Sequence, residues 1–238
     1  MKLPYHMIRP SKGFHIWLFC LLLPLSALAD DPPTYRAELD TMPENREKVT
    51  RFLEVALELS REYPRESVEF NNEALTLAQT LRSREAIVEV HSNFGLVYMN
   101  QSKFNLARES LQKAIRLKKQ LVARKLSPFF YNGSIAEDYR LLGICYDSSN
   151  DPKQAINAFK QGIPFAQKSK SPEQIAKLYN SLGEVQLKIE AFQDAQNSFQ
   201  QALKYAKSAG NPRLARIIER NLTTSYALLQ KYVEAQQY

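Results

Sequence analysis

Glycine, cysteine and histidine are scarce in this chain, and these shortages narrow its fold class. The 238 residues include 7 glycines, 2 cysteines and 3 histidines, and alternating runs rich in valine, isoleucine and threonine are hard to find. Such a composition favours helices over sheets. The few glycines form no phosphate-binding loop. The sequence therefore predicts an all-helical protein without a nucleotide site.

The remaining cysteine and histidine residues are too few for a catalytic or metal site. Outside the leader segment described next, Cys145 is the only cysteine and His91 is the only histidine. One cysteine cannot close an internal disulfide, and one histidine cannot complete a nucleophile–base set or a metal cluster. Both residues occupy helix positions where packing explains them; a reactive thiol at Cys145 and a ligand or pH role for His91 are the alternatives. We therefore expect neither an enzyme nor a cofactor.

The N-terminal segment has the three parts of a secretory signal. Lys2, Arg9 and Lys12 form a positive region, residues 14–28 are almost wholly apolar, and residues 27–29 form an A-x-A cleavage site. The apolar stretch is shorter than the roughly 20 residues that span a bilayer. The sequence predicts a signal peptide at 1–29 and export to the periplasm or cell envelope. An uncleaved membrane anchor is the alternative.

The net charge gives no indication of nucleic-acid binding. The whole chain carries +7, and three basic residues and no acidic residue lie in the leader. The remainder has 29 basic and 25 acidic residues, a surplus of +4. So small a surplus predicts no nucleic-acid partner.

One pattern of residues recurs four times along the chain. Small anchor residues at 95, 143, 183 and 223 are separated by 48, 40 and 40 residues, and an alanine stands twelve places after each. Large residues recur at fixed distances from the anchors, one before (Phe94, Leu142, Leu182, Leu222) and sixteen after (Leu111, Phe159, Phe199). A small residue lets two helices cross closely, and large residues at helical spacings share one face. The pattern predicts packed helix pairs.

These repeats divide the chain into segments. After the leader we expect a linker at 30–43 and repeats near 44–85, 86–134, 135–173, 174–213 and 214–238. The first repeat matches the pattern only weakly. In its first helix, Ala56 and Leu59 can occupy the small and large positions if the turn to the second helix is one residue shorter. The eight extra residues of the 48-residue spacing fall around 125–134, where aromatic rings either fold back on the neighbouring pair or contact a partner.

The last repeat is expected to be incomplete. A first helix at 214–229 is followed only by 232–238 of a second helix, too few residues to cover an apolar face. Either the sequence is a fragment, or a partner or a second copy covers this uncapped edge.

Leu-Gly followed by Tyr on the first helix, then Ala, Phe and Ala on the second, resembles the tetratricopeptide repeat (TPR) over residues 44–238. The resemblance implies an all-α, right-handed superhelical solenoid of TPR helix pairs with a period of about 40. It also implies a concave groove, lined by the first helices, that binds an extended peptide or helix. The residues expected there are Asn93, Arg140, Lys177, Asn180 and Asn221. An ordinary solvated helix face is the alternative.

A leader followed by a weak first pair and 40-residue repeats resembles the exported sensor region of bacterial TPR-containing signalling proteins of the histidine kinase type. The resemblance implies a periplasmic module that binds a protein or peptide. It also implies membrane contact only through an uncleaved leader or a missing C-terminal segment. Two alternatives stay open: a free-standing envelope scaffold or assembly factor, and an accessory subunit that binds polysaccharide. The latter predicts an aromatic-lined groove, with which Tyr139 and Tyr179 are compatible.

Overall fold

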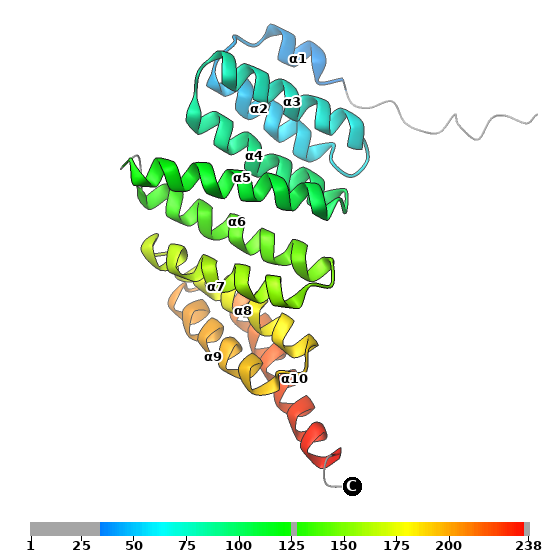
Figure 1. The fold of residues 1–238 in the computed structure, drawn as a ribbon, viewed down its shortest axis with the longest axis vertical. Helices are drawn as coiled ribbons and strands as arrows, with labels where there is room; N and C mark the ends of the chain where they lie inside the picture. The colour runs from blue at the N-terminus through cyan, green and yellow to red at the C-terminus, as the bar shows by residue number, and fades with distance from the viewer. Residues whose placement is uncertain (1–33, 125–127, 236–238) are drawn as a thin grey trace, which may run out of the picture. The chain divides into compact units, whose positions relative to one another are not determined.

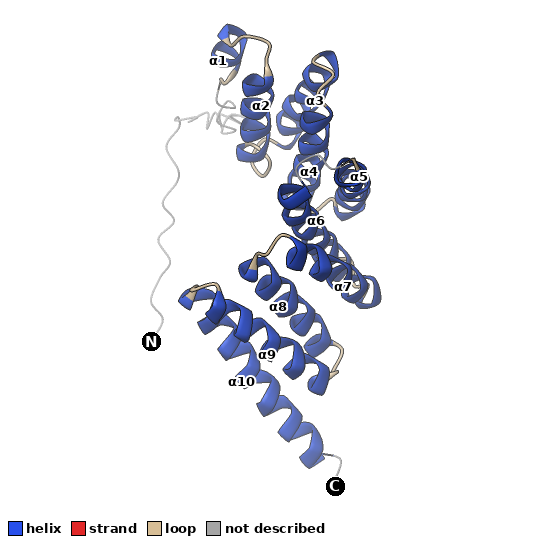
Figure 2. Ribbon diagram, turned by 90° about the vertical axis from the view of Figure 1, so that its left-hand side faces the viewer, coloured by secondary structure: helices blue, strands red, loops and turns tan. Residues whose placement is uncertain are grey.

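The computed structural model describes residues 34–124 and 128–235, and within these ranges every regular element is a helix (Figure 1 and Figure 2). The leader predicted at 1–29 lies outside the described residues. No helix in the described part is both long and apolar enough to cross a membrane.

A short first helix is followed by antiparallel helix pairs that pack in chain order. The helices are α1 (Arg36–Thr41), α2 (Arg46–Glu58), α3 (Pro64–Thr80), α4 (Arg84–Asn100), α5 (Phe104–Ala123), α6 (Pro128–Ser148), α7 (Pro152–Lys168), α8 (Pro172–Lys188), α9 (Phe192–Ser208) and α10 (Pro212–Ala235). The pairs are α2–α3, α4–α5, α6–α7 and α8–α9, each packed on the next. We call α2, α4, α6, α8 and α10 the A helices, and α3, α5, α7 and α9 the B helices.

The 40-residue period follows from the lengths of these elements. From α7 to α9 each helix has 17 residues and each connection has three, so that two helices and two connections give 40. The longer spacing between residues 95 and 143 has the same origin. Three of its eight extra residues lengthen α5, four lengthen α6 and one lengthens the connection between them. The second repeat therefore ends before Pro128, earlier than the predicted boundary at 134.

The three-residue connections share one backbone conformation. The middle residue of each has a positive φ, at Arg82, Ser102, Asn150, Lys170, Glu190 and Gly210. The next residue donates its N–H to the carbonyl five residues earlier, as Ser83 does to Ala78. This is the Schellman ending of a helix, which satisfies carbonyls that have no partner within the helix. Ser83, Asp151, Ser171 and Asn211 then accept a backbone N–H as N-caps of the next helix.

The anchor glycines allow close crossing within each pair, as predicted. A Cβ added to Gly95 would lie 2.5 Å from Leu111, one on Gly143 would lie 2.4 Å from Phe159, and one on Gly183 would lie 2.7 Å from Phe199. The alanines twelve residues after the anchors are fully buried on the B helices from α5 to α9. Large side chains thus fill the space that the glycines leave.

The first pair keeps the same register with different residues. Helix α3 begins forty residues before α5, so the turn that precedes it is not shortened as predicted. The position forty residues before the anchor Gly95 is Val55, and not the predicted Ala56. Val55 fits because Asn71 stands where Leu111 and the two phenylalanines stand in later pairs. The predicted linker at 30–43 also contains structure: Leu39 of α1 is buried against the first pair, and Arg36 pairs with Glu73.

The last helix differs from the prediction. Instead of turning near residue 230 into a second helix, α10 continues from Pro212 to Ala235. Residues 226–235 contain no proline, glycine or asparagine, and most of them are good helix formers, so nothing in the sequence ends the helix there.

Candidate functional site

The A helices bring three of the five predicted binding residues to one cavity. Arg140 on α6 and Lys177 and Asn180 on α8 line a cavity of about 420 Å³, together with Leu214 of α10. Successive A helices place them there because the 40-residue period repeats the same helix face in each pair. This cavity is the candidate binding site, and we call the surface around it the A face.

The fourth residue, Asn221, joins the site through hydrogen bonds. Its side-chain amide donates to the Asn180 oxygen (3.1 Å) and to a Glu184 carboxylate oxygen (3.1 Å). Asn180 also donates to the same Glu184 oxygen (2.9 Å). The three side chains therefore form a polar network between α8 and α10.

The cations of the A-face site are each paired with a carboxylate. Arg140 bonds Glu137 through two hydrogen bonds, at 2.6 and 2.9 Å. Lys177 lies 2.7 Å from Glu173. A third pair joins Lys188 to Asp147, which lines the cavity. The site thus presents both charges and amides, which can bond both the N–H and the C=O groups of a peptide backbone.

The fifth predicted residue, Asn93, lies elsewhere. Its side chain is 8% exposed and donates to the Leu53 carbonyl (3.0 Å) and to the Asn71 side chain (2.9 Å). Both partners belong to the first pair, so Asn93 joins neighbouring repeats in the interior. The structure does not bring it to the cavity.

The sequence reasoning missed the carboxylates Asp147 and Glu184. Glu184 lies one helical turn after Asn180, a spacing at which side chains meet. Asp147 lies 41 residues before its partner Lys188, the same separation as between Asn180 and Asn221. A search for complementary residues one helical turn or one repeat apart could have found both.

His91 and Cys145 are buried, as their interpretation as packing residues requires. Burial and the charge of Lys113 lower the His91 pKa to about 4, so its imidazole is neutral near pH 7. Burial raises the pKa of the Cys145 thiol to about 11. Among the described residues, no group of three or more His, Cys, Asp or Glu side chains is placed to hold a metal ion.

An ion pair that the sequence did not predict lies between α5 and α6. Lys118 Nζ and Asp138 Oδ2 are 2.6 Å apart, and their side chains are 3% and 4% exposed. The Ser92 hydroxyl of α4 donates to the same oxygen at 3.4 Å. Burial raises the pKa of Asp138, and Lys118 opposes this rise. The pair therefore lies in the interior, away from solvent.

The aromatic segment around residues 125–134 contains one residue that fits each of its two interpretations. Tyr131 is buried against Val88 and Leu121, as a ring folded back on the neighbouring pair would be. Phe130 is 62% exposed, as a partner-contact residue would be. Residues 125–127 and the Phe129 side chain lie outside what the structure describes.

The comparisons with known proteins agree on the fold. Residues 88–121 match a family model described as the tetratricopeptide repeat. A putative kinesin light chain from Podospora anserina, with nearly identical TPR-like repeats, superposes with a TM-score of 0.63 at 16% identity. That match covers 82% of this chain and 93% of the other. The chain has the fold of a TPR solenoid. The predicted all-α arrangement of TPR helix pairs is therefore confirmed.

Two further solved structures resemble the TPR solenoid over part of their length. Aspartyl phosphate phosphatase F from Bacillus subtilis has a TM-score of 0.64 at 16% identity, with 82% of this chain and 53% of that chain covered. A Rap protein complexed with Competence and Sporulation Factor has a TM-score of 0.60 at 18% identity, with 82% and 54% covered. This chain thus spans about half of either protein. No curated protein sequence is similar enough to count as a relative.

Proposed function

We propose that this TPR solenoid is an exported, non-enzymatic interaction module that binds an extended peptide or helix on its A face. Its role is that of the sensor part of a signalling protein. The observation that carries the proposal is the cavity between α6, α8 and α10, lined by three residues expected at the binding face.

The chemistry of the cavity suits a peptide better than a simple ion. Its cations are already paired with carboxylates, so the site has little surplus charge of either sign. An extended backbone offers alternating donors and acceptors, which paired charges and amides can bond without strong dependence on sequence. The TPR fold is typically an interaction scaffold, and the neighbour crystallised with Competence and Sporulation Factor supports a binding role for this arrangement of helices.

A displayed library of twelve-residue peptides tests the proposal. Peptides selected on the wild-type protein are measured by fluorescence anisotropy against the double variant Arg140→Ala, Lys177→Ala. Binding is expected to weaken about tenfold or more, the loss of one to two charge-assisted hydrogen bonds. The control Lys204→Ala, Lys207→Ala removes the same charge from α9. The A-face assignment is contradicted if both double variants weaken peptide binding equally, or if the Arg140→Ala, Lys177→Ala variant does not weaken it.

Export is tested by fractionation. Expressed in a Gram-negative host, the protein is expected in the periplasmic fraction with Asp30 as its first residue. A cytoplasmic protein that retains residues 1–29 would contradict the proposal of a cleaved leader.

A free-standing envelope scaffold is the second candidate function. Exposed Ile217 and Leu228, which share one face of α10, give it an apolar surface that a second copy or another envelope protein could cover. Analytical ultracentrifugation decides this: a monomer at high concentration argues against self-association through α10.

A further inference from the structure

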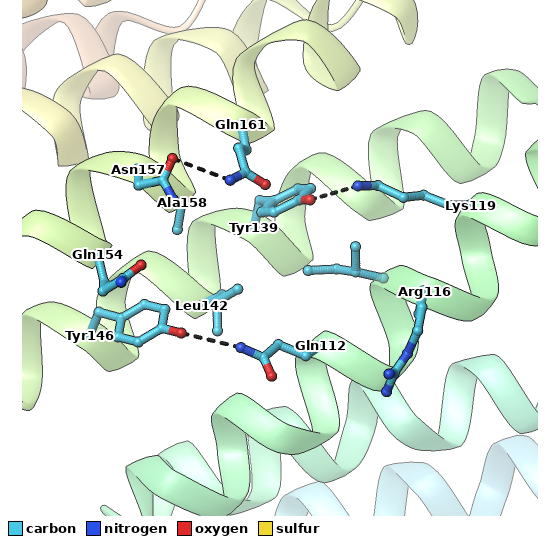
Figure 3. Close-up of a pocket in the computed structure, with 11 residues that line it drawn as sticks. Gln112, Arg116, Lys119, Tyr139, Leu142, Tyr146, Gln154, Asn157, Ala158 and Gln161 are labelled. Carbon is cyan, nitrogen blue, oxygen red and sulfur yellow. Dashed lines mark hydrogen bonds between the residues drawn. The ribbon is translucent and has the colours of Figure 1, made fainter.

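A second cavity lies on the opposite side of α6 from the A-face site. Tyr139, Leu142 and Tyr146 form its floor, at spacings of three and four residues that place them on one helix face. The A-face cavity uses Arg140, Ile144 and Asp147, which lie on the other face of the same helix. In Figure 3 side chains of α5 lie across this floor from side chains of α7. The cavity measures about 290 Å³, and we call it the B groove.

The cations of the B groove are not neutralised. Arg116 and Lys119 line it, and no carboxylate does so among the residues that the structure describes. Neither cation forms an ion pair with any described residue, whereas Arg140, Lys177 and Lys188 on the A face each do. Lys119 donates one hydrogen bond, to the Tyr139 hydroxyl at 2.7 Å, and an ammonium group has two further protons to donate.

The two B helices that flank this groove carry an excess of basic residues. Helices α5 and α7 together contain eight basic residues and one acidic residue, and of the eight only Lys118 is buried against a carboxylate. Helix α3, the B helix of the first pair, contains one basic and three acidic residues. The small overall surplus therefore conceals a basic surface on α5 and α7, and such a surface attracts anions.

Side-chain amides supply both donors and acceptors beside these cations. Gln161 donates to the Asn157 oxygen (3.2 Å), which leaves the Asn157 NH₂ and the Gln161 carbonyl oxygen without a described partner. The Gln154 side chain also lines the groove, and it forms no hydrogen bond with a residue that the structure describes. The Tyr146 hydroxyl accepts from Gln112 (3.2 Å) and keeps its own proton to donate. A phosphate ester would match the donors but not the amide acceptors.

We propose that the B groove binds an acidic saccharide, a sugar unit that carries a carboxylate. Sugar hydroxyls both donate and accept, as the amides do, and the carboxylate is matched by Arg116 and Lys119. The cavity volume is near the lower end for small-molecule sites and accommodates one or two sugar rings. The half-buried ring of Tyr146 gives the sugar carbons an apolar surface. This site is separate from the A-face peptide site and does not depend on it.

Calorimetric titration of the purified protein with trigalacturonic acid tests the proposal, with the neutral methyl ester of the same trisaccharide as the matched probe. The acid is expected to bind, and the ester about tenfold more weakly. Arg116→Gln with Lys119→Gln should weaken binding of the acid by a similar factor. Asn157→Leu should weaken binding of both probes, because it removes an amide and no charge. Circular dichroism verifies that each variant stays folded.

Two controls keep electrostatic attraction distinct from recognition. Lys153→Gln with Lys160→Gln removes the same charge from α7 without touching a lining residue, and it should change affinity less than threefold. An equal loss in this variant, or tighter binding of short polyphosphate or single-stranded DNA than of the trisaccharide, overturns the saccharide assignment. Failure to bind the acid at all also overturns it, and none of these results bears on peptide binding at the A face.

Discussion

The buried ion pair of Lys118 and Asp138 occupies positions that are apolar in the neighbouring repeats. In the register of the repeats, Lys118 corresponds to Ala78, Ala166 and Ala206, and all three alanines are fully buried. Asp138 corresponds to Val90, Leu178 and Ile218, each at most 1% exposed. The chain therefore specifies its own apolar replacement: Lys118→Ala with Asp138→Leu, the pair found in the next repeat at Ala166 and Leu178.

The single and double substitutions should differ strongly in the free energy of unfolding. Lys118→Ala alone leaves the Asp138 carboxylate buried beside only the Ser92 hydroxyl, and breaking such a pair costs about 3–5 kcal/mol. The double substitution removes both desolvation costs. Replacing a buried pair by well-packed apolar residues is neutral or stabilising by up to about 4 kcal/mol. The raised pKa of Asp138 agrees, since the lysine does not fully offset the cost of burying the carboxylate.

Urea denaturation followed by circular dichroism measures these differences. Repeat proteins can unfold in more than one step, so the slope of the transition must agree between variants before midpoints are compared. We expect the single variant to unfold at lower urea than wild type and the double variant at equal or higher urea. A double variant as unstable as the single one would refute the reasoning, because it would show that the pair contributes stability that apolar packing cannot replace.

Three further predictions concern single positions. The folded pKa of His91, about 4, lies below the ordinary value of 6.5, so the wild-type protein should lose roughly 3 kcal/mol of its free energy of unfolding as pH falls from 6.5 to 4. The variant His91→Phe has no imidazole to protonate and should not show this loss. Thermal melts at pH 7 and pH 4 measure the difference. Lys170→Gly should raise the free energy of unfolding by about 0.5 kcal/mol, because φ there is 51°, whereas Lys160→Gly within α7 should lower it by about 1 kcal/mol. Gly183→Ala should cost about 1–3 kcal/mol through its clash with Phe199, and adding Phe199→Val should recover part of that; additive effects would contradict the crossing contact.

Periodicity predicted those parts of the fold that repeat. The anchors at Gly143 and Gly183 and the alanines after them were recognisable because each repeat needs the same close crossing. Features that occur once were not predicted. The eight extra residues lengthen α5 and α6 by about a turn each, and no turn residue marks such growth in the sequence. The continuation of α10 escaped prediction for a related reason, since the repeat pattern favoured a turn where the local sequence has no residue to make one.

The candidate site illustrates why a shared register does not specify a shared role. Asn93 and Asn221 stand at the same place, two residues before their anchors, and each bonds the preceding A helix. Asn93 is buried because Asn71 replaces the large side chain of later pairs and accepts a hydrogen bond from the Asn93 amide. No such replacement exists beside Asn221, since the corresponding residue of its preceding pair is Phe199, and its amide remains beside the A-face cavity with Asn180. The backbone place follows from the period, whereas the exposure of the side chain follows from a residue about twenty positions away on a different helix.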